Sequence, residues 1–437
     1  MKSIDDSACL TASEAAAEIA SGRLKPSDLM AANLERAARL EPTVKAYVHL
    51  DPNAAMKAAR NLGPSSGLLH GLPIAVKDMI DTADMPTQHN SPIYEGHRPA
   101  KDAAIVAITR AQGGVIIGKT DTHEFAAGGR LPKTTNPHDK RHTAGGSSSG
   151  SAAAVAAGTA ALSFGTQTGG STLRPASFCG IFGMKPTFGV VSREGAKLYS
   201  ISLDTIGWYG RSVADLALMA QAQRAIRRPL QMDDDVKGKR FAIYQMPESS
   251  RAETAAIAAL ASTADKLSNA GADVVELSLP SEFDDLATTQ LTIMKGEGRA
   301  AFLDDYLQSH DLLAQDFRDR VEDADNISFR KLRAAQDHIA RCRAIFDTNT
   351  DEFSAVIAIG AAGEAPRDLT TTGDAYFQRM WTALQVPTIG LPGFSGARGM
   401  PIGVQLIGPR YEDAALLEAA FAVSHAIQMP RVSPVPI

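Results

Sequence analysis

Residues 145–171 read GGSSSGSAAAVAAGTAALSFGTQTGGS, and the composition of this stretch differs from that of the rest of the chain. Between its two glycine-rich ends lies Ser151–Ala161, a run of very small side chains that predicts a helix able to approach a neighbouring backbone closely. The glycines and serines at each end indicate turns, because glycine reaches backbone conformations that other residues avoid. The stretch is therefore expected to form a turn, a closely packed helix and a second turn.

The residues before this stretch combine helices with short strands. The segment Thr11-Ala-Ser-Glu14 is a capping-box pattern, in which the threonine accepts from the backbone and the glutamate reaches back. A second helix begins at Pro26 and is expected to end near Glu41-Pro42, because the residue before a proline disfavours the helical conformation. The apolar run Leu72–Val76 then favours a strand.

Strands and helices continue to alternate on both sides of the small-residue helix. Val115–Ile117 favours a strand and follows a helical pattern at Ala103–Ala111. Charged amphipathic helices are predicted farther on, and strand-like runs follow them. Alternation of this kind predicts an α/β fold built on a sheet rather than an all-helical array. The later helices span 252–270 and 329–346, and the later strands span 353–359, 387–392 and 402–407.

The length of 437 residues alone permits two to four domains, at about 100–200 residues per domain. No repeat, low-complexity linker or block of charge marks a boundary. We therefore expect one domain over 1–437. Its expected parts are N-terminal helices at 1–62, a core at 63–212, a helix-rich part at 213–350, and C-terminal strands and a helix at 351–437.

Composition excludes several classes of protein. Hydrophobic residues make up 44% of the chain and charged residues 21%, which is typical of a globular protein and unlike a disordered chain. The formal net charge is −5, which gives no electrostatic reason to expect nucleic acid or an anionic membrane as a partner. Composition does not indicate any particular chemistry.

Cysteine and histidine usage gives no indication of a disulfide framework or a metal site. The three cysteines, Cys9, Cys179 and Cys342, are scattered, and the ten histidines form no H-E-x-x-H pattern. We therefore expect no metal and no cofactor. The first twenty residues carry acids where a secretory leader needs bases. No apolar run reaches the roughly 18 residues of a membrane-spanning helix, so a cytoplasmic protein is expected.

Two formal motif matches are set aside because their sequence context is wrong. Gly113–Thr120 fits the phosphate-binding pattern G-x-x-x-x-G-K-[ST], but its variable positions include Val115–Ile117, which are strand formers rather than loop residues. Gly146–Gly150 fits the nucleophile-elbow pattern G-x-S-x-G. The polar, proline-containing segment Thr134–Ala144 cannot be the strand that must precede such an elbow.

Three segments together supply what amide hydrolysis requires: a nucleophile, a base and donors for the developing oxyanion. Ser171 follows two glycines, whose backbone can approach a substrate carbonyl closely. Lys77 ends an apolar run and is the candidate base because burial disfavours its ammonium form, and Ser147 is a candidate hydroxyl relay between the two. Four successive N–H groups are candidates for a nest around one oxygen, those of Thr168, Gly169, Gly170 and Ser171.

Lys77, the GGSSSGS segment and the GTQTGGS segment resemble the amidase signature family, and weaker similarity extends from Thr11 to about Arg410. The resemblance implies a Ser–cis-Ser–Lys triad, in which Ser171 is the acylated nucleophile, Ser147 the relay in a cis peptide, and Lys77 the acid/base. It also implies one α/β domain with a large mixed, twisted sheet of about eleven strands covered by helices on both faces. Further matching segments are Glu124–Ala126, Asn136-Pro137, Phe178–Gly180, Lys185–Thr187 and Gly403–Gly408.

The chain departs from the family pattern at three places. Ser149 stands where the family commonly has glycine, and Gln167 where it commonly has aspartate. Most members carry arginine two residues after the second serine, whereas this chain has Leu173 there and Arg174 one position later. That spacing resembles the malonamidase and carboxybiuret hydrolase branch, and it implies that Arg174, together with Gln167, binds the substrate. A guanidinium suits a substrate carboxylate because it binds bidentately, and a structural ion pair is the alternative role for Arg174.

The resemblance implies an amidohydrolase that cleaves C–N bonds of small amides or of related ureas and carbamates, with a homodimer as a possible assembly. Carbamates (urethanes) or aryl anilides form the alternative substrate class. A second interpretation is the glutamine-hydrolysing A-type subunit of a tRNA-dependent amidotransferase, which works only with partner proteins. A third is a scaffold that has lost activity and serves in binding, against which the presence of all three triad residues argues. The sequence does not identify which residues of 290–400 line the acyl pocket.

Overall fold

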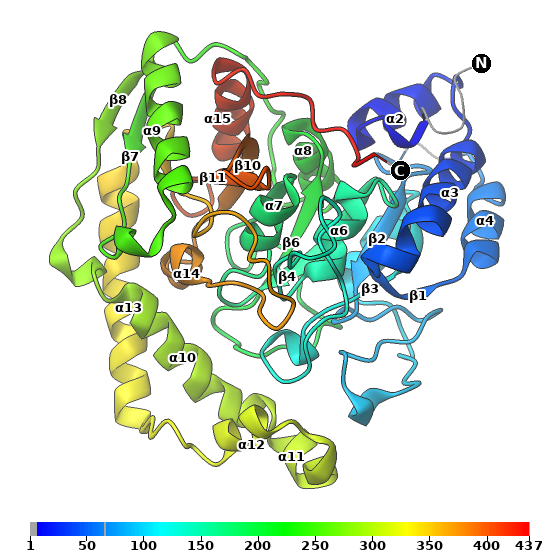
Figure 1. The fold of residues 1–437 in the computed structure, drawn as a ribbon, viewed down its shortest axis with the longest axis horizontal. Coiled ribbons are helices and arrows are strands. Elements are labelled where there is room, and N and C mark those ends of the chain that lie inside the picture. Colours follow the sequence, from blue (N-terminus) through cyan, green and yellow to red (C-terminus); the bar gives the residue numbers. More distant parts are fainter. Residues whose placement is uncertain (1–6, 65–66, 437) are drawn as a thin grey trace.

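The computed structural model describes residues 7–64 and 67–436 of the chain. Eleven strands form one mixed sheet in the order β1-β3-β2-β4-β6-β5-β10-β11-β9-β7-β8 (Figure 1). The pairings from β4 through β6, β5, β10 and β11 to β9 are antiparallel, whereas β2 is parallel to both of its neighbours. The strands are β1 (Tyr47–Leu50), β2 (Pro73–Lys77), β3 (Val115–Thr120), β4 (Leu162–Gln167), β5 (Phe182–Lys185), β6 (Thr205–Gly210), β7 (Arg240–Ile243), β8 (Asp273–Glu276), β9 (Ala355–Ile359), β10 (Thr388–Ser395) and β11 (Pro401–Ile407).

Helices cover both faces of this sheet, as the α/β expectation required (Figure 1). Helix α6 packs on α7, and α8 packs on α15, while α10 contacts both α13 and α14. The α-helices of the described residues are α2 (Ala12–Ala20), α3 (Pro26–Val44), α4 (Pro52–Arg60), α5 (Ala104–Ala111), α6 (Ser149–Ala156), α7 (Leu173–Cys179), α8 (Val213–Ala222), α9 (Thr254–Asn269), α10 (Leu286–Ala301), α11 (Leu303–Ser309), α12 (Gln315–Val321), α13 (Phe329–Thr350), α14 (Tyr376–Ala383) and α15 (Asp413–Ala426). Short 3-10 turns lie at η1 (Pro92–Tyr94), η2 (Glu124–Ala126), η3 (Ser249–Arg251), η4 (Ser281–Phe283) and η5 (His310–Leu312).

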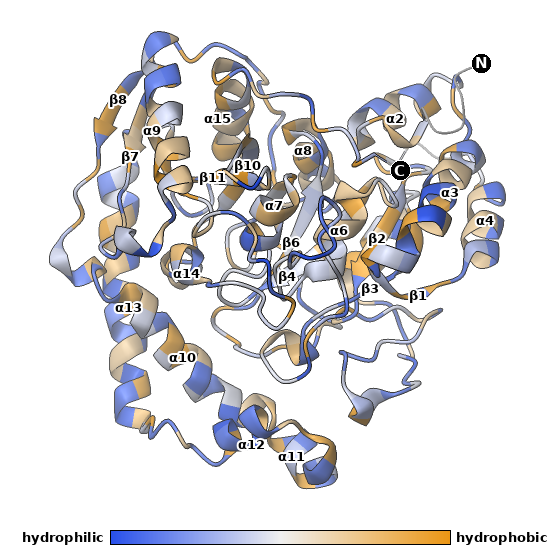
Figure 2. Ribbon diagram, viewed as in Figure 1, coloured by the Kyte–Doolittle hydropathy of each residue, from blue (hydrophilic) through white to orange (hydrophobic). Residues whose placement is uncertain are grey.

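The centre of the sheet is buried on both faces. All residues of β2 and β4 are buried, because each strand has partners on both edges and helices above and below. The outer helices α3, α9 and α13 carry polar and apolar residues side by side in Figure 2, as expected for helices with one face on the core. A polar residue at the end of a central strand is therefore held in a dry interior.

Several predicted elements are confirmed, with shifts at their ends. The capping box at Thr11 is present, with both reciprocal hydrogen bonds. The small-residue helix is confirmed as α6, which begins at Ser149 and ends at Ala156, earlier at both ends than predicted. The predicted end of α3 near Pro42 is wrong, because the helix continues to Val44. Proline is tolerated there because the carbonyl of Ala38, which loses its helical donor, belongs to a solvent-exposed residue.

The described part of the chain bears on the expectations about cysteines, metal sites and membrane-spanning helices. All three cysteines are free thiols. Residues 7–64 and 67–436 contain no group of three or more His, Cys, Asp or Glu side chains placed to hold a metal ion. Over the same residues no helix has the length and apolarity that crossing a membrane requires. The opening residues 1–6, on which part of the leader argument rests, lie outside the described ranges.

Candidate active site

Lys77 is the last residue of β2, and its side chain is fully buried. Its Nζ atom lies 2.7 Å from Ser147 Oγ, 2.7 Å from Thr166 Oγ1 and 3.0 Å from Ser148 Oγ. Thr166 comes from the neighbouring strand β4, and the two serines come from the loop before α6. The sheet and this loop thus surround the amine with three hydroxyl groups.

Burial governs the charge of this lysine. It lowers the pKa of Lys77 well below the ordinary value of 10.5, and the negative charge of Asp204 opposes the shift only in part. A neutral amine has a lone pair, which can accept a proton from a neighbouring hydroxyl. The site therefore holds a buried amine that contacts Ser147 and is a candidate base.

Hydrogen bonds join the loop that carries Ser147 to strand β4. The peptide bond between Gly146 and Ser147 is cis. Ser148 Oγ accepts from the Thr166 N–H and donates to the Thr166 carbonyl, both at 3.1 Å. A Cβ atom added at Gly165 would lie 2.9 Å from Ser148 Oγ, so glycine at 165 makes room for that hydroxyl. Sequence reasoning did not identify Ser148 or Thr166 as neighbours of Lys77, because their contact with it depends on strand pairing across the fold.

Ser171 lies between the end of β4 and the start of α7. Its carbonyl accepts from the Ser148 N–H at 3.3 Å and from the Tyr209 hydroxyl at 3.2 Å, which brings the two serine segments together. Its Oγ makes no hydrogen bond to any other group of residues 7–64 and 67–436, and Ser147 Oγ bonds to Lys77 instead. The candidate nucleophile is thus beside the lysine–serine pair, with its hydroxyl unengaged.

The turn at 168–171 contains the residues whose N–H groups are the candidate oxyanion donors. The N–H groups of Gly169, Gly170 and Ser171 donate to no other group among the described residues. Thr168, the fourth expected member, binds Asp204 Oδ1 at 2.5 Å through its hydroxyl, a contact that does not involve its N–H group. A Cβ atom at Gly170 would lie 2.6 Å from Gln378 Oε1, so a larger residue there would require the Gln378 side chain to move. Three unengaged N–H groups beside a serine form a site for a negatively charged oxygen.

Gln167, which we expected to bind the substrate, makes hydrogen bonds within the protein. Its Oε1 accepts from the N–H groups of Thr172 and Leu173 at 2.9 and 3.0 Å, and its Nε2 donates to Thr382 Oγ1 at 3.0 Å. The residue is fully buried. Both ends of its amide are engaged within the protein, so Gln167 joins the start of α7 to α14.

Arg174 is buried next to the loop that holds Ser147. Its guanidinium donates to the Gly146 carbonyl at 2.6 Å and to Thr372 Oγ1 at 3.3 Å. It forms no ion pair with any acid in the described part of the chain, so a structural salt bridge is not its role, and its Nε has no partner there. Burial, and then the charge of Arg379, lower the pKa of Arg174 to about 10, which leaves it charged at neutral pH.

Neither rejected motif acquires a site in the structure. Val115–Thr120 is the buried strand β3 rather than an open phosphate loop. Its lysine, Lys119, pairs at 3.1 Å with the carboxylate of Asp78. Gly146–Gly150 has a helix after it, as a nucleophile elbow does, but the residues before it form no strand. In both cases the local structure differs from the one that the motif requires.

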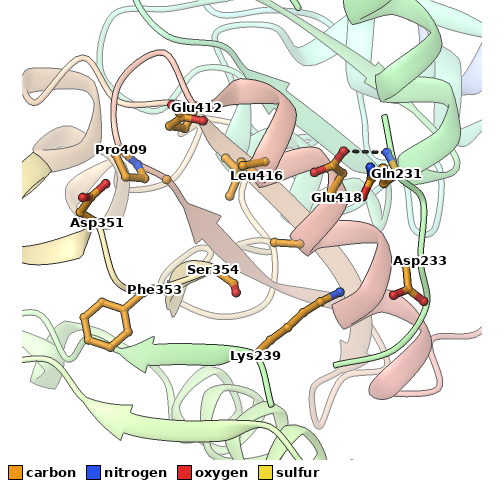
Figure 3. Close-up of a pocket in the computed structure, with 13 residues that line it drawn as sticks. Gln231, Asp233, Lys239, Asp351, Phe353, Ser354, Pro409, Glu412, Leu416 and Glu418 are labelled. Carbon is orange, nitrogen blue, oxygen red and sulfur yellow. Dashed lines mark hydrogen bonds between the residues drawn. The ribbon is translucent and has the colours of Figure 1, made fainter. Parts of the chain in front are cut away.

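Figure 3 shows a surface cavity of about 400 Å³, with α15 on one side and Phe353 and Ser354 on the other. No triad residue lines it, and its lining includes the acids Asp233, Asp351, Glu412 and Glu418. A smaller cavity is lined by Thr166, Thr168, Phe125, Lys197 and Asp204 among others. Of these residues, Thr166 contacts the Lys77 amine, but the three triad residues are not in the lining of this cavity either.

The sequence of this chain is similar to those of known proteins. A sequence model of the Amidase family matches residues 28–417. The chain is 39% identical over 295 residues to the A-type subunit of the glutamyl-tRNA(Gln) amidotransferase of Chloroflexus aurantiacus, with 62% of this chain and 61% of that protein covered. It is 30% identical over 462 residues to the corresponding subunit of Gloeobacter violaceus, with 92% and 93% covered.

A solved structure shows the same architecture. The native peptide amidase of Stenotrophomonas maltophilia superposes with a TM-score of 0.80 at 28% sequence identity, with 97% of this chain and 98% of that chain covered. The first of the sequence relatives is matched over only about three fifths of its length, 61%. The family match, by contrast, spans nearly the whole sheet and its helices. The chain belongs to the Amidase family.

Proposed function

We propose that the protein hydrolyses C–N bonds of small amides, or of related ureas and carbamates, through an acyl-enzyme on Ser171. The observation that carries this proposal is the buried Lys77 amine, 2.7 Å from Ser147 Oγ and beside a serine with three unengaged N–H groups. A nucleophile, a proton relay and an oxyanion site are the parts that acyl transfer needs.

The proposed steps move each proton to a named atom. Ser171 Oγ attacks the carbonyl carbon while its proton passes to Ser147 Oγ, and the Ser147 proton passes to neutral Lys77 Nζ. The N–H groups of Gly169, Gly170 and Ser171 receive the oxygen that becomes negative. The protons return along the same path to the departing nitrogen as the C–N bond breaks. Water then repeats the sequence as nucleophile and releases the acid and Ser171.

For the substrate, we propose a small molecule that bears a carboxylate, as the malonamidase-like spacing at Arg174 suggests. Arg174 has no acidic partner in the described residues, and its Nε is buried without an acceptor. Arg379 is near enough for its charge to lower the pKa of Arg174. Their nearest acid, Asp374, is shared between Arg251 and Arg379 at 3.4 and 3.5 Å. The excess of positive charge favours an anionic substrate group.

A substrate series tests the proposal. Amides, anilides, ureas and carbamates, each with and without a carboxylate, are offered to the wild type, Ser171→Ala and Arg174→Gln. We expect no turnover by Ser171→Ala, and a larger loss for acidic than for neutral substrates in Arg174→Gln. The quantity to compare is the ratio of the rates on acidic and neutral substrates. Arg174 also donates to the Gly146 carbonyl, so its replacement is expected to lower the rate on every substrate. Equal losses on both substrate classes would exclude carboxylate recognition by Arg174.

The curated relatives favour a second candidate, the glutamine-hydrolysing subunit of a tRNA-dependent amidotransferase. In that case the chain needs partner proteins that accept ammonia. Hydrolysis of simple amides by the purified chain alone, with no response to glutamine, would reject this candidate. Glutamine hydrolysis that rises only when such partners are added would establish it.

A further inference from the structure

Three consecutive carbonyl groups in the turn before Ser171 are each held by a donor from a different helix. The Thr168 carbonyl accepts from Gln290 Nε2 of α10 at 2.7 Å. The Gly169 carbonyl accepts from Thr382 Oγ1 of α14 at 2.7 Å. The Gly170 carbonyl accepts from the Arg174 N–H of α7 at 3.0 Å. Two of these donors are side chains from outside the residues that resemble the family signature.

A carbonyl held in this way also fixes the next N–H group. The peptide unit is planar, and in a trans peptide the N–H points opposite to the C=O. The single cis bond of the described residues is at Gly146–Ser147, so the three peptides after Thr168, Gly169 and Gly170 are trans. Their N–H groups, those of Gly169, Gly170 and Ser171, therefore point away from the holding donors, and they are the unengaged donors of the candidate oxyanion site.

Gln290 has little other use in the fold. It is completely buried on α10, and its Oε1 has no hydrogen-bond partner within residues 7–64 and 67–436. A buried polar atom without a partner costs stability. An apolar residue at this position would fill the same space without that loss of stability. We therefore attribute the presence of a glutamine here to the hydrogen bond from its Nε2 to the Thr168 carbonyl.

The direction of the Thr382 hydroxyl is set by Gln167. Because Gln167 Nε2 donates to Thr382 Oγ1, the threonine proton is left free to donate elsewhere. It has the Gly169 carbonyl at 2.7 Å and the Gln378 carbonyl of its own helix at 3.2 Å, and the shorter bond goes to the turn. An aspartate at 167 cannot donate in this way when ionised. In this chain Gln167, where the family commonly has aspartate, therefore orients the Thr382 hydroxyl.

We infer that Gln290 and Thr382 are positioning residues, which aim the N–H groups of Gly169 and Gly170 at the oxygen that becomes negative in the transition state. This inference rests on the proposed function and deepens it. Donors fixed before the reaction are worth more than donors that must reorient during it. The orientation of the oxyanion donors thus depends on helices α10 and α14, which are far in sequence from the serines and the lysine.

Thr382→Val and Gln290→Met remove the two donors with little change of volume. We expect kcat to fall about 10-fold to 100-fold in each, somewhat less than the loss of a whole oxyanion donor, while KM changes less than about threefold. Affinity for a boronic acid inhibitor, which forms a tetrahedral adduct with a serine, should fall by the same factor as kcat/KM. Thr382→Ser keeps the hydroxyl and should restore most of the rate.

Matched controls separate positioning from general damage. Gln223→Met removes a buried glutamine whose Nε2 holds the Ile105 carbonyl and whose Oε1 likewise lacks a partner, and Thr263→Val removes a buried helical threonine. Both controls should keep kcat within about twofold of the wild type. Thermal unfolding of all variants establishes that they are folded.

The inference is overturned if Thr382→Val and Gln290→Met are folded and keep wild-type kcat, or if they raise KM alone, or if boronate affinity is unchanged. Failure of the proposed function has a different signature. In that case the wild type itself neither hydrolyses any member of the substrate series nor binds the boronate. An active wild type with unaffected variants counts against the positioning role only.

Discussion

Two buried lysines stand on neighbouring strands, and their surroundings differ. Lys77 ends β2 among three hydroxyl groups, whereas Lys119 of β3 contacts the carboxylate of Asp78 at 3.1 Å. Lys119 is in register with Val76, so the two amines lie on opposite faces of the sheet. Burial lowers the pKa of both, but Asp78 opposes that shift for Lys119. A carboxylate favours the charged form, whereas hydroxyl groups leave the buried amine able to act as a base.

Replacing Lys77 tests the catalytic half of this comparison and should give the largest effect. Lys77→Met removes the proposed base, and we expect kcat/KM to fall by about 10³-fold or more, because general acid–base catalysis contributes up to roughly 10⁴-fold. Initial rates on the best member of the substrate series measure this loss. A folded Lys77→Met variant with a rate near that of the wild type would remove Lys77 from the mechanism.

Replacing Lys119 tests the structural half. Lys119→Met leaves Asp78 buried without its cation, and we expect the free energy of unfolding to fall by about 3–5 kcal/mol. Denaturant unfolding measures this loss. The double variant Asp78→Asn with Lys119→Met removes both charges and should recover part of the stability. If Lys119→Met is as stable as the wild type, the pair does not hold the structure as the contact indicates.

The pH profile tests the difference in charge. Catalysis needs neutral Lys77, so kcat/KM should fall as the pH falls through the lowered pKa of this group, well below 10.5. The free energy of unfolding should also rise with pH. Lys77 binds a proton more readily in the unfolded chain than in the folded one, so this residue lowers stability near neutral pH. The loss disappears as the pH rises towards 10.5. A rate that first appears near pH 10 would show that Lys77 is not shifted.

Replacing Asp204 should give the smallest effect of this series. Its charge raises the pKa of Lys77, so Asp204→Asn should move the acid limb of the rate profile to lower pH. The same measurement on Asp81→Asn, whose charge acts on Lys119, should leave the limb in place. A shift to higher pH in Asp204→Asn would contradict the direction of this interaction.

Local sequence patterns predicted much of the fold. The apolar run before Lys77 indicated the buried strand β2, and the capping box at Thr11 indicated the start of α2. Both depend on neighbouring residues, which a sequence displays directly. The end of α3 was predicted wrongly at Pro42. Whether a proline ends a helix depends on whether the carbonyl that loses its hydrogen-bond donor is exposed to solvent.

The parts of the site that sequence reasoning missed all depend on distant contacts. Thr166 meets Lys77 across 89 positions of sequence, and Gln290 meets Thr168 across 122. Neither belongs to a pattern that indicates the contact. Gln167 was expected to bind the substrate from the family resemblance, whereas the packing of α14 engages its amide within the protein. Spacing along the chain predicts which residue types are available, and packing decides what each one contacts.

Covalent labelling of Ser171 tests the central claim most directly. The wild type, Lys77→Met and Lys119→Met are exposed to a fluorophosphonate probe, and the modified peptide is identified by mass spectrometry. We predict rapid modification of Ser171 in the wild type and in folded Lys119→Met, and almost none in Lys77→Met. Labelling of Lys77→Met at the wild-type rate, or an unmodified Ser171 in the wild type, would contradict the claim that the buried lysine activates this serine.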